Sequence, residues 1–390
     1  MRVVQVCPYD LSRHGGVQQH ILSLAAELRR GGHAVLVIGP GEQVSDNDLD
    51  LRMGRMSLIS FLGTSFELSL ASKTELQALA TKLAAWKPDI IHYHTLWVPL
   101  LPWQIFRQTR VASVATFHDT PPPGLAGAVL RAAFKLMSRF LLRRLDGAIA
   151  VSGAPLAHLR PGRHGIRPVI LPPATDLSDF FSLKKDTPTD EQTVLFMGRL
   201  EPRKGIHVLL EAWEMIASGR VALSRGLKMP RLVIAGSGEL ETIVVEASQR
   251  LGDASLQYVP APDRESHLRL LAQASIAVSP ALYGESFGIV LVESLASETP
   301  VIAASNAGYL NVLTGQGRDL LVAAGDAKAL AKKIVELLAG KDERESLGRW
   351  GRGHARQFDI SAIAPEVEAL YQSALATYSR SKRQGAGNQV

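Results

Sequence analysis

"IAVSPALYGESFGIVLVESLASETPVIAAS", residues 276–305, has the pattern of a strand, a helix and a second strand. A short apolar run leads through a glycine-containing bend into a helical segment, and a second apolar run follows "SETP". Two short buried strands joined by one helix are typical of a parallel sheet with helical crossovers. The stretch therefore predicts an α/β domain, and it leaves two carboxylates, Glu285 and Glu293, to be explained in a segment that is otherwise mostly apolar.

The same alternation of strand and helix patterns runs through the rest of the chain, which indicates a second domain of the same α/β class. With 390 residues, the chain is longer than one hydrophobic core usually accommodates. Strands are predicted over 2–7, 34–39, 89–94, 113–118 and 147–152 in the first half, and over 193–198, 231–236, 256–261, 276–281 and 301–305 in the second.

The segment over 171–192 separates the two halves, because it is rich in Pro, Asp, Ser and Thr and has neither a helical nor a strand period. It predicts an N-terminal domain over 1–180 and a C-terminal domain over 181–365. A helix over 366–380 is predicted to pack back on the N-terminal domain, and 381–390 is predicted to be a flexible tail.

The composition of the chain limits the kinds of partner it can bind and the cell compartment in which we expect it. The net charge of +6 and the pI near 9.4 favour an anionic partner, and nucleotide, nucleic acid and anionic lipid all remain open on charge alone. The single cysteine, Cys7, forms no internal disulfide, and no signal-peptide pattern or membrane-spanning apolar run is found. We therefore expect a cytoplasmic protein, at most peripheral on the inner face of the cell membrane.

Polar residues and glycines at the strand ends are the candidate ligand contacts, because open α/β sheets bind ligands beyond the carboxyl ends of their strands. Gly15 and Gly16 precede a helix whose amino terminus favours an anion, although a plain turn would look the same. Arg199 and Lys204 follow the strand over 193–198 and suit a diphosphate; the alternative is a solvated basic turn.

The two glutamates of the opening stretch fall at another such strand end. Glu285 lies just before the predicted helix over 287–296, and Glu293 lies about two turns into it. Glu293 suits a vicinal diol such as ribose, and Glu285 suits hydroxyl groups beyond a phosphate at the helix amino terminus. The alternative is that Glu285 caps the helix, a role for which the neighbouring Ser286 is better suited.

Other chemistries find little support. Asp46, Asp48 and Asp50 alternate as in a calcium loop, but Leu51 and Ser57 stand where that loop needs Gly and Glu, so no metal site is predicted. No Ser-His-Asp or Cys-His set emerges. Residues 234–242, "IAGSGELET", lack the third glycine of a dinucleotide-binding fingerprint.

Taken in order, these segments resemble the GT-B glycosyltransferases of glycosyltransferase family 4. Within that family the chain is most similar to the phosphatidylinositol mannosyltransferases, through its start "VCPYDLSRHGGVQQHIL", the "EPRKG" loop and "TFHD". The resemblance covers nearly the whole chain and is carried by "GGVQQHILSLAAELRRGGH", "PDIIHYHT", "TFHD", "FMGRLEPRKGIHVLLEAW", "IAGSGE" and "SPALYGESFGIVLVESLASETPVIAA".

The resemblance implies two Rossmann-like domains facing across a cleft and a retaining, metal-independent transfer of a sugar, with mannose the best choice. The donor would be GDP-mannose or a UDP-sugar, no cofactor would be needed, and the acceptor would be a lipid, a lipid-linked sugar or a glycan in cell-envelope or polysaccharide synthesis. The residues implied as catalytic are His118, Arg199, Lys204 and Glu285. Those implied to bind the donor are Gly15, Gly16, Gly198, Gly236, Ser286, Phe287, Gly288, Ile289 and Glu293.

The sequence also departs from the family pattern. It has "PPATD" where the family has "PNGVD", "SETP" where the family has a small residue paired with Gly, and Asn311 where the family has Glu. These changes leave the diphosphate site intact and put the sugar and base preference in doubt. His118 also has a structural interpretation. Together with His92 and His94 it could be a histidine at a strand end whose hydrogen bonds are made within the sheet.

Residues 126–147 predict a helix with a basic stripe, since its cations recur every four residues. An ordinary crossover helix with a solvated basic face is one interpretation. The other is a helix that rests on an anionic membrane and brings a lipid acceptor to the donor. The stripe consists of Arg131, Lys135, Arg139 and Arg143.

Two rival functions stay open at this point. A nucleotide-sugar epimerase or hydrolase on the same fold would share the cation loop and the glutamates, but it needs a further acid, base or nucleophile that the sequence does not reveal. A basic nucleic-acid-binding protein is disfavoured, because only 6% of the chain is aromatic and no nucleic-acid-binding module is found.

Overall fold

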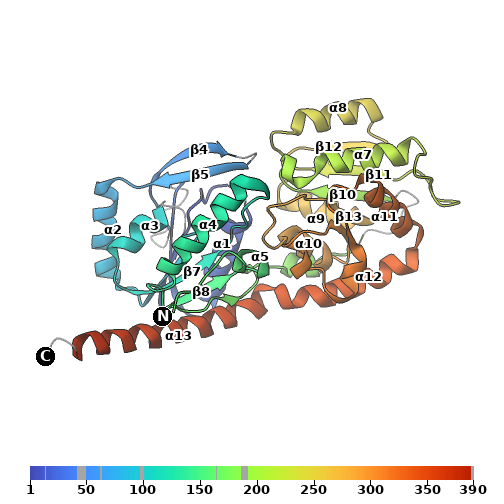
Figure 1. Cartoon of the computed structure of the whole chain (residues 1–390). Coiled ribbons are helices and arrows are strands. Elements are labelled where there is room, and N and C mark those ends of the chain that lie inside the picture. Colours follow the sequence, from blue (N-terminus) through green and yellow to red (C-terminus); the bar gives the residue numbers. More distant parts are fainter. Residues whose placement is uncertain are drawn as a thin grey trace. The chain divides into compact units, whose positions relative to one another are not determined.

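A computed structural model describes residues 1–13, 15–41, 50–61, 64–96, 101–163, 165–185 and 192–387 (Figure 1). The chain divides into two compact units. Unit 1 contains Met1–Asp176 and Phe358–Val390, and unit 2 contains Leu177–Gln357. The chain thus enters unit 2 four residues before the predicted boundary and leaves it eight residues before the predicted one.

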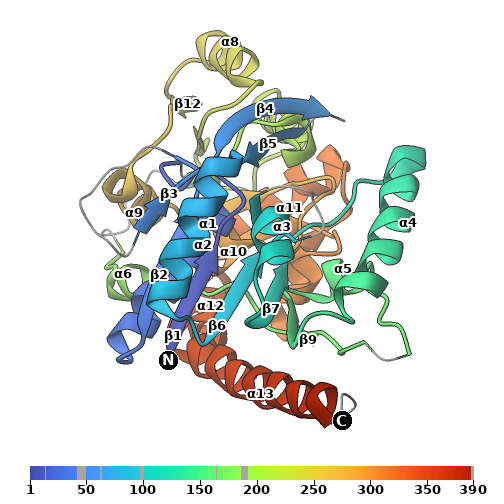
Figure 2. The same cartoon turned by 90° about the vertical axis from the view of Figure 1, so that its left-hand side faces the viewer.

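Unit 1 is built on a seven-stranded parallel sheet in the order β3-β2-β1-β6-β7-β8-β9. Figure 2 shows β1, β2, β6 and β7 side by side. The strands are β1 (Arg2–Val6), β2 (Ala34–Gly39), β3 (Asp50–Arg52), β6 (Ile90–His94), β7 (Ala112–Phe117), β8 (Gly147–Ala150) and β9 (Val169–Ile170). All five strands predicted in the first half are present, and the sheet is extended by β3 and β9, which the sequence pattern missed.

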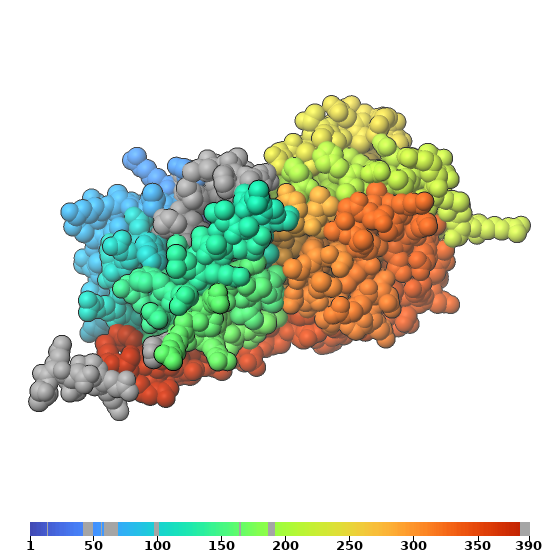
Figure 3. Space-filling model, in the orientation of Figure 1, coloured from blue at the N-terminus to red at the C-terminus, as the bar shows by residue number. Residues whose placement is uncertain are grey.

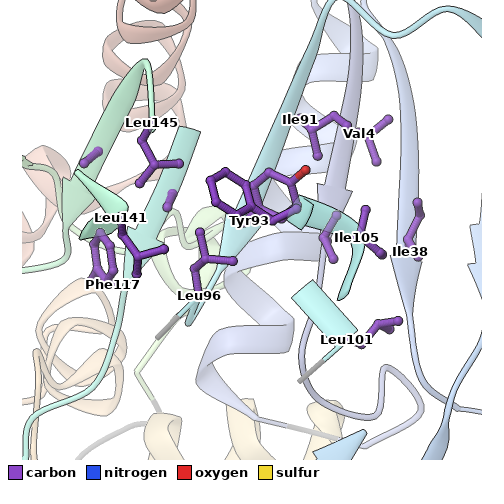
Figure 4. Close-up of a cluster of buried hydrophobic side chains, with 14 of the residues drawn as sticks. Val4, Ile38, Ile91, Tyr93, Leu96, Leu101, Ile105, Phe117, Leu141 and Leu145 are labelled. Carbon is purple, nitrogen blue, oxygen red and sulfur yellow. The ribbon is translucent and has the colours of Figure 1, made fainter. Parts of the chain in front are cut away.

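Helices cover both faces of this sheet, because the side chains of each strand alternate between two apolar clusters. Val3 of β1 faces one cluster and Val4 the other. The helices are α1 (Gly16–Arg30), α2 (Lys73–Trp86), α3 (Leu101–Gln108), α4 (Gly124–Leu141), α5 (Gly153–Leu156) and α13 (Ile360–Gly387). Helices α1 and α13 supply side chains to the first cluster, and α2, α3 and α4 to the second, part of which Figure 4 shows around Tyr93.

Helix α13 belongs to unit 1 although it follows unit 2 in the sequence. Figure 2 shows α13 running along the edge of unit 1. The helix contacts α1, β7 and β8, and Val367 and Tyr371 are buried in its packing face. The helix is longer than the predicted one over 366–380. Its backbone stays helical through most of the predicted tail, to Gly387, and residues 388–390 lie outside the described part.

Unit 1 also contains a two-stranded hairpin that the sequence pattern missed. β4 (Arg55–Phe61) and β5 (Thr64–Leu70) form an antiparallel hairpin that is separate from the main sheet. The hairpin follows the aspartate-rich segment in which Asp46 and Asp48 were weighed as calcium ligands, and those two residues lie outside the described residues.

Unit 2 is built on a six-stranded parallel sheet in the order β12-β11-β10-β13-β14-β15. Its strands are β10 (Thr193–Met197), β11 (Arg231–Ala235), β12 (Leu256–Val259), β13 (Ile276–Ser279), β14 (Val301–Ala304) and β15 (Leu321–Val322). Its helices are α6 (Ser178–Ser182), α7 (Ile206–Ala217), α8 (Glu241–Leu251), α9 (Arg264–Gln273), α10 (Ile289–Ala296), α11 (Ala327–Ala339) and α12 (Lys341–Ala355). The opening stretch of the sequence is the unit β13-α10-β14, as predicted.

Candidate active site

The candidate donor site lies at the carboxyl edge of the sheet in unit 2. Strands β11, β10 and β13 are neighbours in the sheet, so the loops that follow them meet at one edge. Gly198 and Arg199 follow β10, Gly236 follows β11, and the loop that carries Glu285 follows β13. The sequence-predicted cations and Glu285 are therefore brought together by the sheet order.

Two predicted glycines let the first two of these loops pack backbone against backbone. A Cβ atom on Gly236 would lie 1.9 Å from the carbonyl oxygen of Gly198, and the φ of Gly236 is 147°. The amide of Gly198 donates to the carbonyl of Ala235 at 3.1 Å, and that of Leu200 donates to the carbonyl of Ser237 at 2.8 Å. Any larger residue at Gly236 would displace the loop that holds Arg199.

Three cations and two carboxylates form one network at this edge. Arg199 Nη1 lies 2.6 Å from Glu201 Oε1, and Arg203 Nε lies 2.7 Å from Glu201 Oε2. On the other side, Arg203 Nη1 lies 3.0 Å and Lys204 Nζ 2.7 Å from Glu285 Oε1. Three positive charges against two negative ones leave the network with an excess of one positive charge.

The members of the network differ in their exposure to solvent. The side chain of Arg203 is 9% exposed and lies between the two glutamates, whereas that of Arg199 is 56% exposed. Burial of Glu285 would raise the pKa of its carboxyl group, but Lys204 and Arg203 outweigh this effect, so its pKa lies below the ordinary value. Glu285 is therefore ionised at neutral pH, and Arg199 is the most exposed cation of the network.

Glu201 and Arg203 are the members of the network that the sequence interpretation missed. Both stand in the quoted "EPRKG" loop, in which Pro202–Lys204 form a single 3-10 turn. That turn puts successive basic residues within reach of different carboxylates. The sequence signal was the extra Arg between Pro202 and Lys204, but its partner Glu285 is supplied by a loop 82 positions away.

Helix α10 begins at Ile289, two residues later than predicted, and its N-cap residue is Gly288. Neither Glu285 nor Ser286 is therefore the N-cap residue, the position at which a cap was considered. Gly288 has a φ of 111°, and a Cβ atom there would lie 2.7 Å from the ring of Tyr309. The chain consequently turns at Ser286, Phe287 and Gly288, between Glu285 and the amino terminus of the helix.

Glu293, the second glutamate of the pair, is buried one turn into α10. Its Oε2 lies 3.6 Å from His267 Nε2 on α9. Burial lowers the pKa of His267 to about 4, with a further contribution from Arg264, so the imidazole is neutral at pH 7 and the two groups are not an ion pair. A role of Glu293 in binding ribose stays a prediction.

Unit 1 carries the remaining predicted site residues. Gly15 is the N-cap of α1 and Gly16 its first residue, and this helix has no side-chain cap. His118 directly follows β7 and is buried. Its Nε2 lies 3.1 Å from Nδ1 of His94, and the ring of His20 packs edge to face against it with centroids 5.2 Å apart.

The structure thus brings four imidazoles together, those of His20, His92, His94 and His118, all within the core of unit 1. Burial lowers the pKa of each: His20 titrates at about 4, and the other three titrate well below the ordinary value, with neighbouring imidazoles adding to the effect. All four are therefore neutral at pH 7. Sequence reasoning had paired His118 with His92 and His94 only as an alternative to a catalytic role, and it had missed His20.

Nitrogen atoms of His20, His94 and His118 lie within 4.8 Å of one another, a spacing that could hold a metal ion. The amide of Ala174 donates to His20 Nδ1 at 2.7 Å, so the proton of the neutral ring is on Nε2, the atom left to bind a metal. Metal binding would require that proton to leave an imidazole that still accepts a hydrogen bond. This geometry argues against a metal ion at the cluster.

The predicted basic stripe lies on α4, at the surface of unit 1 (Figure 3, teal). Arg131, Lys135 and Arg139 are within the helix, whereas Arg143 follows its end at Leu141. Lys135, Arg139 and Arg143 are exposed, and Arg131 donates to the carbonyl of Pro122 at 3.0 Å.

Helix α4 also exposes an apolar stripe, which the sequence interpretation did not foresee. Its members recur at intervals of four, seven and four residues, so they share one side of the helix. The helix packs on the core with the opposite side, through Phe134, Met137 and Leu141. The exposed stripe consists of Leu125 (90% exposed), Val129 (70%), Leu136 (72%) and Phe140 (42%).

Comparison with known proteins defines the class. Residues 14–179 match the Glycosyltransferase Family 4 domain, and residues 178–354 match the domain described as Glycosyl transferases group 1. Together the two matches span both α/β units. The chain belongs to the family 4 glycosyltransferases of the GT-B fold, and it is an enzyme that transfers hexosyl groups.

Individual relatives are similar over their full length. The chain is 29% identical to the phosphatidyl-myo-inositol mannosyltransferase of Propionibacterium freudenreichii subsp. shermanii, covering 98% of this chain and 97% of the relative. It is also 29% identical to the enzyme of the same name from Mycobacterium leprae, with coverages of 97% and 99%. Among solved structures, a sucrose-phosphate synthase from Thermosynechococcus elongatus shares the fold, with a TM-score of 0.72, 23% identity and coverages of 96% and 99%.

Family membership sets aside the two rival functions, since neither a nucleic-acid-binding protein nor an epimerase or hydrolase accounts for these matches. Within the part of the chain that the structure describes, no helix combines the length and apolar character needed to cross a bilayer.

Proposed function

We propose that the protein is a retaining, metal-independent mannosyltransferase that moves mannose from GDP-mannose to phosphatidylinositol or a closely related lipid. The observation that carries this proposal is the network of Arg199, Arg203 and Lys204 with Glu201 and Glu285, whose excess positive charge suits a sugar diphosphate. The choice of mannose and of an inositol lipid follows the names of the full-length relatives.

The chemistry requires stabilisation of the leaving group. As the bond between the sugar and the diphosphate breaks, negative charge grows on the phosphate oxygens and the sugar becomes oxocarbenium-like. Cations fixed before the reaction stabilise this charge without reorganisation, and a buried network fixes them well. Arg199, the most exposed cation, would contact the diphosphate directly, and Lys204 would do so from its position on Glu285.

The same network gives Glu285 a role at the sugar. Its carboxylate is held ionised by Lys204 and Arg203, so it can accept hydrogen bonds from sugar hydroxyl groups. Because Glu285 precedes the amino terminus of α10, whose N-cap is Gly288, a phosphate bound by the amides of Gly288 and Ile289 would lie beside that sugar.

Nucleotide preference is tested by thermal unfolding of the full chain with GDP-mannose, GDP, UDP-glucose and UDP. A ligand that binds only the folded state at 100 times its Kd stabilises it by about 2.7 kcal/mol. For a unit of this size that is a rise in Tm of roughly 5–10 °C. We expect this rise with GDP and GDP-mannose and a smaller rise in Arg199→Ala. A larger rise with the UDP ligands would contradict the choice of GDP-mannose.

For the acceptor, we propose that α4 rests on an anionic membrane surface. The exposed apolar stripe can enter the acyl boundary while the cations beside it contact lipid phosphates, a combination that is typical of interfacial helices. An ordinary crossover helix would not expose Leu125, Val129 and Leu136 to this extent. Each cation near an anionic surface contributes about 1 kcal/mol, so part of the attachment is sensitive to salt.

Sedimentation with vesicles of phosphatidylcholine and phosphatidylinositol at low and high salt tests this role. We expect strong binding at low salt and weaker binding at high salt. Gln at Arg131, Lys135, Arg139 and Arg143 should remove the salt-sensitive part, and Ser at Val129 and Leu136 should remove most of the rest. Met229→Ser, an exposed apolar position in unit 2, is the control. Absence of binding at low salt, or unchanged binding by both stripe variants, would reject the membrane role.

A further inference from the structure

A continuous chain of hydrogen bonds joins His118 to the C-terminal helix. Strand alternation places Gln5, His92, His94 and Thr116 on the sheet face that α1 and α13 cover. All four residues are fully buried, and so is Tyr371, which α13 contributes. Since neutral imidazoles carry one proton each, the hydrogen bonds of this chain decide which ring nitrogen carries it.

The hydrogen bonds that run from Gln5 through Tyr371 to His92 determine which ring nitrogen of His92 carries the proton. Gln5 Nε2 can only donate, and it donates to the Tyr371 hydroxyl at 2.9 Å. The hydroxyl proton of Tyr371 is then directed to His92 Nδ1, 2.7 Å away. Because Nδ1 accepts, the proton of His92 is on Nε2, which donates to Thr116 Oγ1 at 2.7 Å.

The hydrogen bonds that run from Gln5 through His94 to His118 determine which ring nitrogen of His118 carries the proton. Gln5 Oε1 can only accept, so His94 Nε2 donates to it at 2.9 Å. Nδ1 of the neutral His94 therefore carries no proton and accepts from His118 Nε2 at 3.1 Å. It follows that His118 carries its proton on Nε2 and that its Nδ1 is a bare acceptor.

We propose that Gln5 and Tyr371 are positioning residues that fix His118 as the Nε2–H tautomer, so that Nδ1 of His118 accepts a hydrogen bond from a hydroxyl group of the bound sugar or polyol. The hydroxyl-bearing ligand rests on the proposed function; the tautomer does not. The orientation of the Gln5 side-chain amide determines the tautomers of the three histidines. If the Gln5 side chain were turned over, every proton in the chain would reverse, and His118 would present Nδ1–H to the ligand instead.

The tautomers can be measured directly by NMR of the full chain with ¹⁵N-labelled histidine, since two-bond correlations distinguish Nε2–H from Nδ1–H rings. Resonances are assigned from single His→Gln variants. We expect His92, His94 and His118 as Nε2–H at pH 7.5. In Tyr371→Phe, Gln5 and His92 lose the hydroxyl that orients them, so the three histidines should become mixtures of both tautomers.

The matched control is Tyr378→Phe, two turns further along α13, whose hydroxyl donates to the carbonyl of Arg110 and takes no part in the chain. It should leave all three tautomers unchanged. If Tyr371→Phe is poorly folded, Gln5→Met is used instead. It removes the side-chain amide that sets the proton positions and should give the same mixture of tautomers. Finding His94 or His118 as Nδ1–H in the native chain, or unchanged tautomers in both Tyr371→Phe and Gln5→Met, would overturn the proposal.

Transfer assays supply the second readout. Tyr371→Phe should lower kcat/KM by about 2- to 10-fold, the range expected when one hydrogen bond loses its orientation, and Tyr378→Phe should not lower it. Failure of every variant and of the native chain to transfer sugar would reject the proposed function and leave the tautomer assignment standing. Full activity of Tyr371→Phe, with altered tautomers, would reject the role of Nδ1 in binding substrate.

Discussion

Replacing Lys204 or Arg199 with alanine is expected to lower kcat for sugar transfer by on the order of 10²- to 10³-fold, the loss seen when one preorganised group that stabilises transition-state charge is removed. Both cations lie in the network at the carboxyl edge of unit 2, where the leaving diphosphate would bind. Initial rates at saturating donor measure the effect. The KM for the donor should change less than kcat, because the charge on the diphosphate grows as the bond breaks.

Stability distinguishes this effect from unfolding. In Lys204→Ala the carboxylate of Glu285 keeps Arg203 as a partner, so we expect a loss of only about 1–2 kcal/mol in the free energy of unfolding. Arg225→Ala, which removes an exposed arginine of unit 2, is the control and should retain full activity. Activity within a few-fold of the native chain in both Lys204→Ala and Arg199→Ala would rule out the diphosphate role.

The second large effect that we expect is a loss of folding stability at acidic pH. The four clustered histidines have folded pKa values below the unfolded value of about 6.5, so the unfolded chain binds more protons as the pH falls. Their contribution to stability is complete above pH 6.5 and is lost progressively below it, down to about pH 4 for His20. Each histidine contributes up to about 1.4 kcal/mol per pH unit, and four contribute up to about 5.5. Since domains have only about 5–15 kcal/mol of stability, unit 1 should be markedly less stable at pH 5 than at pH 7.5.

Urea unfolding followed by circular dichroism at pH 7.5, 6.5, 5.5 and 5.0 measures this slope. His20→Asn should reduce the slope by about 1.4 kcal/mol per pH unit, because one depressed titration is removed while the asparagine Oδ1, at the position of Nδ1, can still accept from the Ala174 amide. His207→Gln, at an exposed histidine of unit 2, is the matched control and should leave the slope unchanged. A stability that is constant between pH 6.5 and pH 5 would contradict the buried neutral cluster.

The fold was largely predictable because parallel strands that are buried on both faces form short continuous apolar runs. All ten predicted strands are present, and the opening stretch folds as β13-α10-β14. The strands that escaped prediction are β3, β9, β15 and the β4–β5 hairpin. The first three are two or three residues long and lie at sheet edges, where neither length nor hydrophobicity marks them.

The candidate donor site was predictable in part. Arg199, Lys204 and Glu285 stand at strand ends, and any parallel sheet brings such positions to one edge. That Arg203 is buried between two carboxylates could not be predicted, because it depends on the side-by-side placement of β10 and β13. The preference for a particular nucleotide or sugar has no comparable signal in these residues.

The histidine cluster shows a different limit. Alternation along β1, β6 and β7 puts Gln5, His92 and His94 on one face, and the sequence contains that information once the strands are known. The closing contact comes from Tyr371, on a helix 366 residues away from Gln5 in the sequence. Only the return of the chain from unit 2 to unit 1 makes that contact possible.

The central claim, that this glycosyltransferase moves mannose to an inositol lipid with retention, is tested most directly by one transfer reaction. The full chain is incubated with GDP-mannose and phosphatidylinositol vesicles in the presence of a chelator, with Lys204→Ala in parallel, and the product is analysed by mass spectrometry and proton NMR. We predict a mannosyl phosphatidylinositol with the same anomeric configuration as the donor, formed at full rate with the chelator and nearly absent with Lys204→Ala. No mannosyl lipid, a product of inverted configuration, or a reaction that stops when metal is removed would contradict the proposal.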